Sequence, residues 1–387
     1  MTLLAGNFKR ICFGNMLMYI SQYMLLPTIP VVITERLNGP LAYTGVVFLL
    51  LLSGVLLISP LLNYLQDVFR RKKLALFAFF TLLVTTAIYY VIDSIEGISF
   101  LALIQGVAFG VTSSTFITLG IDLLPSENRS GGNLILAWYA RLGMIMGIAV
   151  GSAVYLNYGF DWLLLGALII GVLGFFFLEM THVPFRAPIG VKLLSMDRFF
   201  LPKTWLLVLN MILITIIPAM LFPLIHFKVR DVFLLDTWSV PYFLLVGIGF
   251  VLSMLFAKKV FVGQELRKRI LIGLLLIVIA VSLFIIFNTL AGLVVSAVLF
   301  GAGLGFVTTD FLLMFINMSS HCERATANYT YLLSWKIGIS VGVGLACYLR
   351  EHASLGATFH YCMLLAALSL FFFIALAYPY YTKRKIR

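Results

Sequence analysis

Long apolar segments, separated by short polar ones, dominate the pattern along the chain. A membrane-spanning helix needs about 20 consecutive apolar residues. Twelve segments meet this length, at approximately 11–33, 43–65, 74–92, 97–120, 133–156, 160–180, 204–226, 238–257, 270–288, 291–317, 328–349 and 356–380. Because lipid offers the backbone no hydrogen-bond partners, only helices and closed barrels cross a membrane. These segments are too long and too uniformly apolar for barrel strands, so they predict an all-α membrane protein with twelve transmembrane helices.

The composition supports this class and explains the basic charge. The chain of 387 residues is 62% hydrophobic and 11% charged, whereas a soluble domain is about 25% charged. A net charge of +12 would by itself suggest a nucleic-acid partner. However, 21 of the 27 lysines and arginines lie in the alternate connections on the side of the N-terminus. By the positive-inside rule, we expect both termini in the cytoplasm, a cell (inner) membrane location and no nucleic-acid partner.

Nothing in the sequence indicates an enzyme. The four cysteines have no metal-ligand spacing, and neither a metalloprotease helix motif nor a nucleotide-binding loop is present. We therefore expect no metal and no bound cofactor, with the proton gradient as the energy source.

The two halves of the chain repeat each other with a spacing of 195 residues and no gap. Matching pairs include Gly106 with Gly301, Asn15 with Asn210, Arg129 with Arg324, Gly147 with Gly342 and, basic for basic, Arg141 with Lys336. Six helices followed by six in the same orientation form a parallel repeat. We expect an N-terminal six-helix bundle over 1–180, a cytoplasmic linker over 181–203 and a C-terminal six-helix bundle over 204–387. A weaker match, Gln66-Asp67 with Gln264-Glu265, has a spacing of 198.

The connection from Asn63 to Lys73 carries one acid and four bases, Asn-Tyr-Leu-Gln-Asp-Val-Phe-Arg-Arg-Lys-Lys. It resembles the signature loop between helices 2 and 3 of the major facilitator superfamily (MFS), although Asn63, Val68 and Arg70 depart from that pattern. The resemblance implies the MFS fold of two pseudo-symmetric six-helix bundles. It also implies a conformational latch in which Asp67 pairs with bases and helix ends across the closed cytoplasmic side while Arg71 holds the loop. The alternative is that these bases only mark the cytoplasmic side.

The fifth span resembles the glycine-rich helix 5 of the antiporter branches, through Gly147 and Gly151. Ile148 stands where that motif has proline. Together with the compact loops, this similarity points to the bacterial efflux-type branch. Small residues four apart also let two helices approach closely, and close packing alone accounts for both glycines.

Three ionisable residues at membrane depth are the strongest site candidates: Arg141, Asp310 and Lys336. A charge at this depth costs about 2.5–3.5 kcal/mol on insertion scales, which makes each a functional hypothesis. All three lie about 10–12 Å above the cytoplasmic ends of their helices, so they could share one layer. We expect Arg141 and Lys336 to bind an anionic substrate group in a central cavity. Asp310 either neutralises Lys336 or carries a coupled proton; alternatively, the pair is structural.

Polar and aromatic residues at similar depths complete the predicted substrate site. They are Asn15, Tyr19, Gln22, Gln105, Trp138, Asn210 and Trp335. Each could equally form a helix–helix hydrogen bond or pack between helices.

Together, these features predict a monomeric secondary active transporter that moves a small-molecule substrate through the lipid bilayer by alternating access. The first expectation is proton-coupled efflux, as an antiporter, of an amphipathic or anionic compound. The alternatives are proton-linked or facilitated uptake of a nutrient anion, or a lipid flippase on the same fold.

Overall fold

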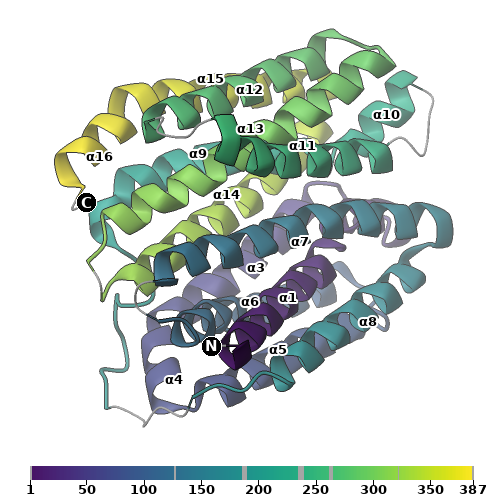
Figure 1. Ribbon diagram of the computed structural model, residues 1–387. Helices are drawn as coiled ribbons and strands as arrows, with labels where there is room; N and C mark the ends of the chain where they lie inside the picture. The colour runs from purple at the N-terminus through teal and green to yellow at the C-terminus, as the bar shows by residue number, and fades with distance from the viewer. Residues whose placement is uncertain are drawn as a thin grey trace. The chain divides into compact units, whose positions relative to one another are not determined.

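The computed structural model describes residues 2–125, 128–184, 190–233, 239–260, 265–320 and 322–385, and this part of the chain is helical without strands (Figure 1). The first half contains α1 (Thr2–Tyr23), α2 (Ile29–Val31), α3 (Tyr43–Ile58), α4 (Leu62–Val68), α5 (Arg71–Ile88), α6 (Ile95–Asp122), α7 (Arg129–Tyr158) and α8 (Phe160–Glu179). The second half contains α9 (Trp205–Leu221), α10 (Ile225–Phe233), α11 (Ser239–Val260), α12 (Leu266–Ile286), α13 (Leu290–Asn317), α14 (Arg324–His352), α15 (Leu355–Phe372) and α16 (Tyr378–Arg384). Short π- or 3₁₀-helical segments lie at Val32–Arg36, Ser59–Leu61, Pro202–Thr204 and Phe373–Ala377.

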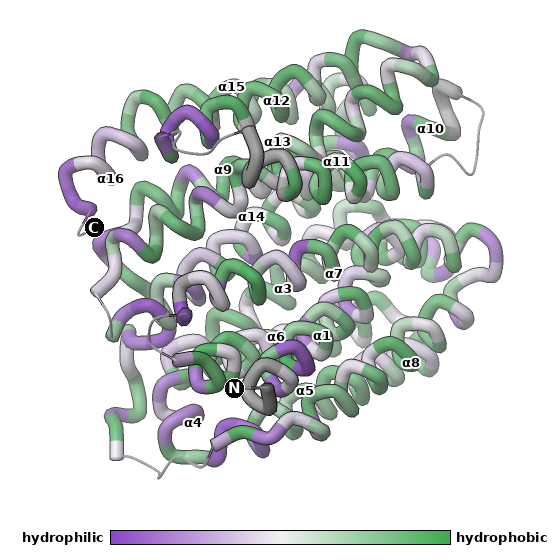
Figure 2. The backbone as a smooth tube through the Cα atoms, in the orientation of Figure 1, coloured by the Kyte–Doolittle hydropathy of each residue, from purple (hydrophilic) through white to green (hydrophobic). Residues whose placement is uncertain are grey.

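Helices form in each of the twelve predicted segments, so the prediction of an all-α membrane protein is confirmed. Within the described residues, nine helices are long and apolar enough to cross a membrane. The predicted segments outside these nine are 11–33, 74–92 and 238–257, the last of which contains a shorter apolar helix at Val240–Ser253. Figure 2 shows apolar residues over most of each long helix and hydrophilic residues mainly near the helix ends.

Four prolines lie within or next to the ends of helices. α1 ends at Tyr23, four residues before Pro27, and Pro30 lies in the next short helix. Pro218 lies inside α9, and Pro223 lies in the break between α9 and α10. Because proline lacks the backbone N–H that a helix interior requires, these positions end or bend a helix.

The chain divides into two compact units, with the main boundary between Pro202 and Lys203. Unit 1 comprises 1–39, 46–202 and 319–333, and unit 2 comprises 40–45, 203–318 and 334–387. The first ten residues of α14 therefore belong to unit 1, although the rest of that helix belongs to unit 2.

Unit 1 contains helix pairs whose backbones approach closely because one helix has a glycine at the contact. A Cβ on Gly106 of α6 would lie 2.0 Å from the carbonyl oxygen of Leu51 in α3. Likewise, α7 packs on α1 through Gly147 and Gly151, where a Cβ would lie 2.7 Å from the Ile20 oxygen and 2.3 Å from the Met24 oxygen. Only glycine fits at such separations, so these positions fix how closely the helices approach.

The same contacts recur inside unit 2 with the 195-residue spacing that the sequence shows. A Cβ on Gly301 of α13 would lie 1.9 Å from the carbonyl oxygen of Val246 in α11, and these two positions correspond to Gly106 and Leu51. Gly342 of α14 lies against the backbone of Ile216 in α9, as Gly147 lies against α1. The sequence repeat therefore reflects the same helix packing in each unit.

Alanine substitution tests this packing. Gly106→Ala and Gly301→Ala each force two backbones apart, and overpacking of this kind costs about 1–3 kcal/mol. Both variants should lower the thermal denaturation midpoint of the purified protein in detergent. Gly131→Ala in α7 is the control, because nothing lies within 4 Å of its added Cβ and alanine favours a helix by up to about 1 kcal/mol. Unchanged midpoints for Gly106→Ala and Gly301→Ala would contradict the close approach.

Candidate functional site

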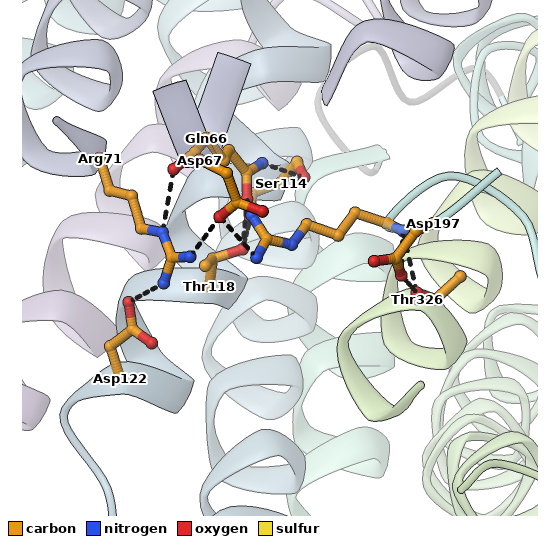
Figure 3. A network of polar contacts seen from close by, with 9 residues as sticks. Gln66, Asp67, Arg71, Ser114, Thr118, Asp122, Asp197 and Thr326 are labelled. Atoms are coloured by element: carbon orange, nitrogen blue, oxygen red, sulfur yellow. Dashed lines mark hydrogen bonds and ion pairs between the residues drawn. The ribbon is translucent and has the colours of Figure 1, made fainter. Parts of the chain in front are cut away.

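The signature loop forms a chain of ion pairs within unit 1 (Figure 3). Asp67 Oδ1 lies 2.6 Å from Arg71 Nη2 and 2.9 Å from Arg198 Nη2. Arg71 also donates to Asp122 Oδ2 at 2.5 Å and to the backbone oxygen of Gln66 at 3.1 Å. The side chains of Asp67, Arg71 and Asp122 are each about 90% buried. Water therefore weakens the attraction between these charges only a little.

The helix boundaries explain why these residues need one another. Arg71 is the first residue of α5 and Asp122 is the last residue of α6. A cation at a helix N-terminus and an anion at a C-terminus both oppose the helix dipole. Their 2.5 Å contact places each charge beside its opposite and offsets both penalties. α4 ends at Val68 and α5 begins at Arg71, so Asp67 and Arg71 lie on opposite sides of a short extended break, and their ion pair closes it.

Gln66 anchors this cluster to the interior of unit 1. Its side chain is 1% exposed and donates from Nε2 to Ser114 Oγ at 2.7 Å. Its Oε1 accepts from Thr118 Oγ1 at 2.6 Å and from Arg198 Nη1 at 3.4 Å. The loop is therefore bonded to two successive turns of α6 through one buried amide.

The linker residue Arg198 connects this network to the beginning of α14. The backbone at Arg198 has a φ of +55°, a left-handed conformation that costs roughly 1–2 kcal/mol for a residue with a Cβ. Its N–H lies 2.9 Å from both Asp197 Oδ1 and Thr326 Oγ1, and Thr326 Oγ1 donates to Asp197 at 2.7 Å. Leu201 N also donates to Thr330 at 2.9 Å. These hydrogen bonds hold the linker in a strained conformation against α14.

The surroundings shift the pKa values of the two arginines in opposite directions. Burial lowers the pKa of Arg71, but Asp122 and Asp67 together raise it above its ordinary value. Burial also lowers the pKa of Arg198, and there the attraction of Asp67 does not overcome burial. Both guanidinium groups stay charged at physiological pH. Asp67 therefore contacts two charged arginines, of which Arg71 has a second carboxylate, Asp122, beside it.

Gln66, Asp122 and Arg198 were missed by the sequence analysis. An acid two residues after the fourth predicted span, on the base-rich side, was the available signal for Asp122. No sequence signal placed Arg198 beside Asp67, because that contact depends on the path of the linker.

A second polar network crosses unit 1 at membrane depth. Gln105 Nε2 donates to Gln22 Oε1 at 2.7 Å, and Tyr89 OH donates to Gln105 Oε1 at 2.9 Å. Gln22 Nε2 in turn donates to Thr86 Oγ1 at 3.3 Å. The predicted residues Gln22 and Gln105 thus form one hydrogen-bonded chain between α1, α5 and α6, and Gln22 is the partly exposed member.

Arg141 is buried among aromatic side chains of unit 1. It is 3% exposed, and its guanidinium carbon lies 4.9 Å from the centre of the Tyr331 ring. Tyr19 is fully buried nearby in electrostatic range of Arg141, and its ring packs edge-on against Phe109 at 5.5 Å. Trp138 lies one turn before Arg141 on α7 and is half-buried.

Asn15 and Asn210, the repeat-related asparagines, bond helix to helix. Asn15 Nδ2 donates to the Leu136 oxygen at 3.5 Å, joining α1 to α7. Asn210 Nδ2 donates to the Ser369 oxygen at 2.9 Å, joining α9 to α15. Their described contacts are therefore those of packing residues.

In unit 2, Asp310 forms an ion pair with a residue that the sequence analysis did not select. Arg269 Nη2 lies 2.8 Å from Asp310 Oδ1, and Arg269 Nε lies 3.0 Å from Oδ2. The sequence analysis left open whether Asp310 neutralises Lys336, and the described ion pair of Asp310 is with Arg269. A long guanidinium near the start of α12 reaches an acid two turns from the end of α13. Lys336 and Trp335 are buried in α14.

The two units share this arrangement but place the acid differently. Arg269 stands 198 residues after Arg71, the spacing of the weaker repeat, and both lie near the start of a helix. Asp122 ends α6, but the last residue of α13 is Asn317, and the acid Asp310 lies about 10 Å deeper along that helix. The Gln264 member of this repeat lies outside the described residues.

Long apolar helices and the same glycine packing in both units define a multi-pass membrane protein. The family model of the Major Facilitator Superfamily matches residues 11–343, and the chain belongs to this superfamily. It is therefore a membrane transporter and not an enzyme. No curated protein sequence matches the chain.

Solved structures show the same fold at low identity. A point mutant of the nucleoside transporter NupG is 16% identical with a TM-score of 0.73, covering 95% of this chain and 99% of its own. The human organic anion transporter MFSD10 is 19% identical with a TM-score of 0.70, covering 95% of this chain and 99% of its own. An inward-facing bacterial homologue of the human lysosomal transporter Spinster is 14% identical with a TM-score of 0.70, covering 100% of this chain and 99% of its own.

A double-mutant cycle tests whether the signature-loop charges act as one unit. Asp67→Asn and Arg71→Gln should each destabilise the protein, because each removes one charge from a largely buried network and leaves the remaining charges with fewer opposite charges beside them. The double variant should lose less than the sum, with a coupling of about 1 kcal/mol or more in thermal denaturation. Arg70→Gln, an exposed neighbour, is the control and should have little effect. Strictly additive losses would show that Asp67 and Arg71 do not stabilise each other.

Proposed function

We propose that the protein is a proton-coupled secondary transporter that exports a small organic anion with an apolar or aromatic body. Arg141 carries this proposal. It is a guanidinium with 3% exposure, in the interior of a membrane helix, that lies against an aromatic ring. Such a charge is costly in lipid and marks a functional site by default.

The chemistry around Arg141 suits an amphipathic anion. A cation over a ring face gains about 2 kcal/mol or more when desolvated, so Tyr331 keeps the guanidinium in place before substrate arrives. The guanidinium fork can bind a carboxylate through two hydrogen bonds. Tyr19 and Tyr331 supply apolar surface for the rest of such a molecule. The buried Lys336 is proposed as a second cation for the same substrate, as its repeat position predicts.

Asp310 is the proposed proton carrier. Its bidentate contact with Arg269 stabilises the ionised carboxylate, because an opposite charge favours the charged form. Separation from Arg269 would leave a buried carboxylate that takes up a proton to avoid the cost of burial. We propose that proton binding and separation of this pair occur together during the transport cycle.

The signature-loop network is the proposed latch on the cytoplasmic side. Asp67, through Arg198, connects the first half of the chain to the linker and so to the first turns of α14. We propose that this end faces the cytoplasm, with both termini, in a monomer in the inner membrane. In this account the network forms in one state of alternating access and opens in the other.

A second candidate is uptake of a neutral, hydrogen-bonding nutrient. The amide chain of Gln22 and Gln105 favours it, because two linked amides offer both donors and acceptors at membrane depth. A nucleoside is one such solute, and the structurally similar NupG is a nucleoside transporter.

Flux into proteoliposomes separates the two candidates. Arg141→Gln should reduce transport of aromatic carboxylates by about tenfold or more, because a charge-assisted bidentate contact is lost, and Arg141→Lys should restore part of it. Arg36→Gln, at a partly exposed arginine, is the control and should transport normally. Under the second candidate, Gln105→Leu abolishes nucleoside flux while Arg141→Gln retains it. Normal carboxylate flux in Arg141→Gln would refute the first candidate.

Coupling is tested with Asp310→Asn under an imposed pH gradient. This variant cannot release a proton, so it should lose accumulation against a concentration gradient but still exchange substrate down one. Asn317→Asp provides a comparison, since it places an acid at the end of α13 and leaves Asp310 in place. If Asp310→Asn still accumulates substrate in proportion to the pH gradient, the proton is carried elsewhere.

A further inference from the structure

A cavity of about 350 Å³ lies inside unit 1, next to the signature-loop network and apart from the residues proposed to bind substrate. It is bounded by the start of α5, the end of α6, the beginning of α7, the linker and the first turn of α14. Its lining consists of Arg71, Thr118, Ile121, Asp122, Arg129, Asn133, Asp197, Arg198, Cys322, Arg324 and Ala325. Three of these residues, Arg71, Asp122 and Arg198, also belong to the proposed latch, but none is proposed to bind substrate or carry the proton.

The charges that line the cavity favour an anion. Four of these residues are arginines and two are aspartates, which leaves an excess of positive charge. Both aspartates also accept hydrogen bonds from the protein: Asp122 accepts from Arg71 at 2.5 Å, and Asp197 accepts from the Arg198 backbone and Thr326. Asp67 lies outside the lining but contacts both Arg71 and Arg198, so three carboxylates stand against four guanidinium groups and one positive charge remains in excess. A pocket with an excess of guanidinium charge attracts a negatively charged ligand.

Asn133 gives an independent sign of a missing acceptor. Its side chain is 1% exposed and lines the cavity. Its Nδ2 has no hydrogen-bond partner among the residues that the structure describes. A buried donor without an acceptor costs about 1–3 kcal/mol, so native structures rarely leave one. Nδ2 has almost no accessible surface, so a turn of this side chain toward the cavity would bring the amide to a bound oxyanion.

Two helix N-termini add to the positive electrostatic potential in the cavity. Arg129 is the first residue of α7 and Arg324 is the first residue of α14, and the two are related by the 195-residue repeat. Arg324 is 8% exposed. Each helix contributes about half a positive charge at its N-terminus, where backbone N–H groups favour anions. Two arginines at equivalent positions of the repeat, each the first residue of a helix, therefore line the same cavity.

We propose that this cavity binds a small phosphate-bearing anion that is distinct from the transported substrate. Arginine forks bind phosphate oxygens through paired hydrogen bonds, and the amide of Asn133 supplies another donor. The volume is at the lower end of ligand pockets and suits a phosphomonoester or the head group of an anionic lipid. The bound anion joins Arg198 of the linker to Arg324 of α14, and so stabilises the attachment of residues 319–333 to unit 1.

Ligand-dependent thermal denaturation tests the site without any transport assay. The full chain, purified in neutral detergent, is titrated with inorganic phosphate or glycerol 3-phosphate, with chloride holding the ionic strength constant. In a second arm the protein is placed in phosphatidylcholine nanodiscs with or without phosphatidylglycerol. We expect a saturable rise in the denaturation midpoint. A soluble ligand gives this rise in the first arm, and a lipid head group gives it in the second.

Variants locate the effect. Arg324→Gln and Asn133→Leu should each raise the half-saturating concentration, or the required lipid fraction, by about tenfold or more. Asn133→Leu replaces one amide with an apolar group of similar size, so it carries the test if Arg324→Gln fails to fold. Arg70→Gln removes an exposed arginine outside the cavity and should keep the wild-type response. Absence of stabilisation in both arms, or equal losses in Arg70→Gln and Asn133→Leu, would overturn the proposal.

Discussion

The carboxylate of Asp67, shared between Arg71 and Arg198, is the interaction on which the base-rich end of unit 1 depends. Removing a charge from water costs several kcal/mol, and only an opposite charge at hydrogen-bonding distance returns that cost. Arg71 meets two carboxylates, whereas Arg198 meets one and also has a strained backbone. The first contact holds the loop together, and the second joins it to the linker and to α14. A buried charge without its partner is unfavourable, so the network is stable in two states, either fully formed or open with its charges in water. A latch requires two such states.

The two units share their packing but differ in their charges. Glycines separated by 195 residues press the same pairs of helices together in each unit, because close packing tolerates nothing larger at those positions. The charged residues are not bound by this constraint. In unit 1, Arg71 meets an acid at the end of α6, whereas in unit 2 Arg269 meets an acid two turns deeper in α13. The first acid ends its helix, and the second lies about 10 Å further inside its helix. In the function that we propose, the first contact opens and closes the cytoplasmic side, and the second couples transport to protons.

The helices and the repeat could be predicted from the sequence, because long apolar segments and regularly spaced glycines are local patterns. In lipid, such segments have few conformations available other than a helix. Sequence reasoning selected Asp67 and Arg71 through a motif. It missed Asp122 and Arg198, because their partners are set by where α6 ends and how the linker turns. It left open whether Asp310 pairs with Lys336 at matched depth along two helices, and it did not select Arg269. Depth alone does not fix which faces of two helices meet, and the described ion pair of Asp310 is with Arg269. The amide of Asn133 gave no signal at all, since its significance depends on a cavity formed by five separate segments.

A reversible cross-link between the linker and α14 tests the latch most directly. In unit 1, Asp197 Oδ1 and Thr326 Oγ1 lie 2.7 Å apart, and Cys322 is the exposed cysteine, whereas Cys12, Cys347 and Cys362 are buried. The measurement is substrate flux in an Asp197→Cys/Thr326→Cys protein on a Cys322→Ser background, before oxidation, after oxidation and after reduction. If the network must open in every cycle, flux stops when the disulfide forms and returns when it is reduced. Full flux in the completely cross-linked protein would contradict the account.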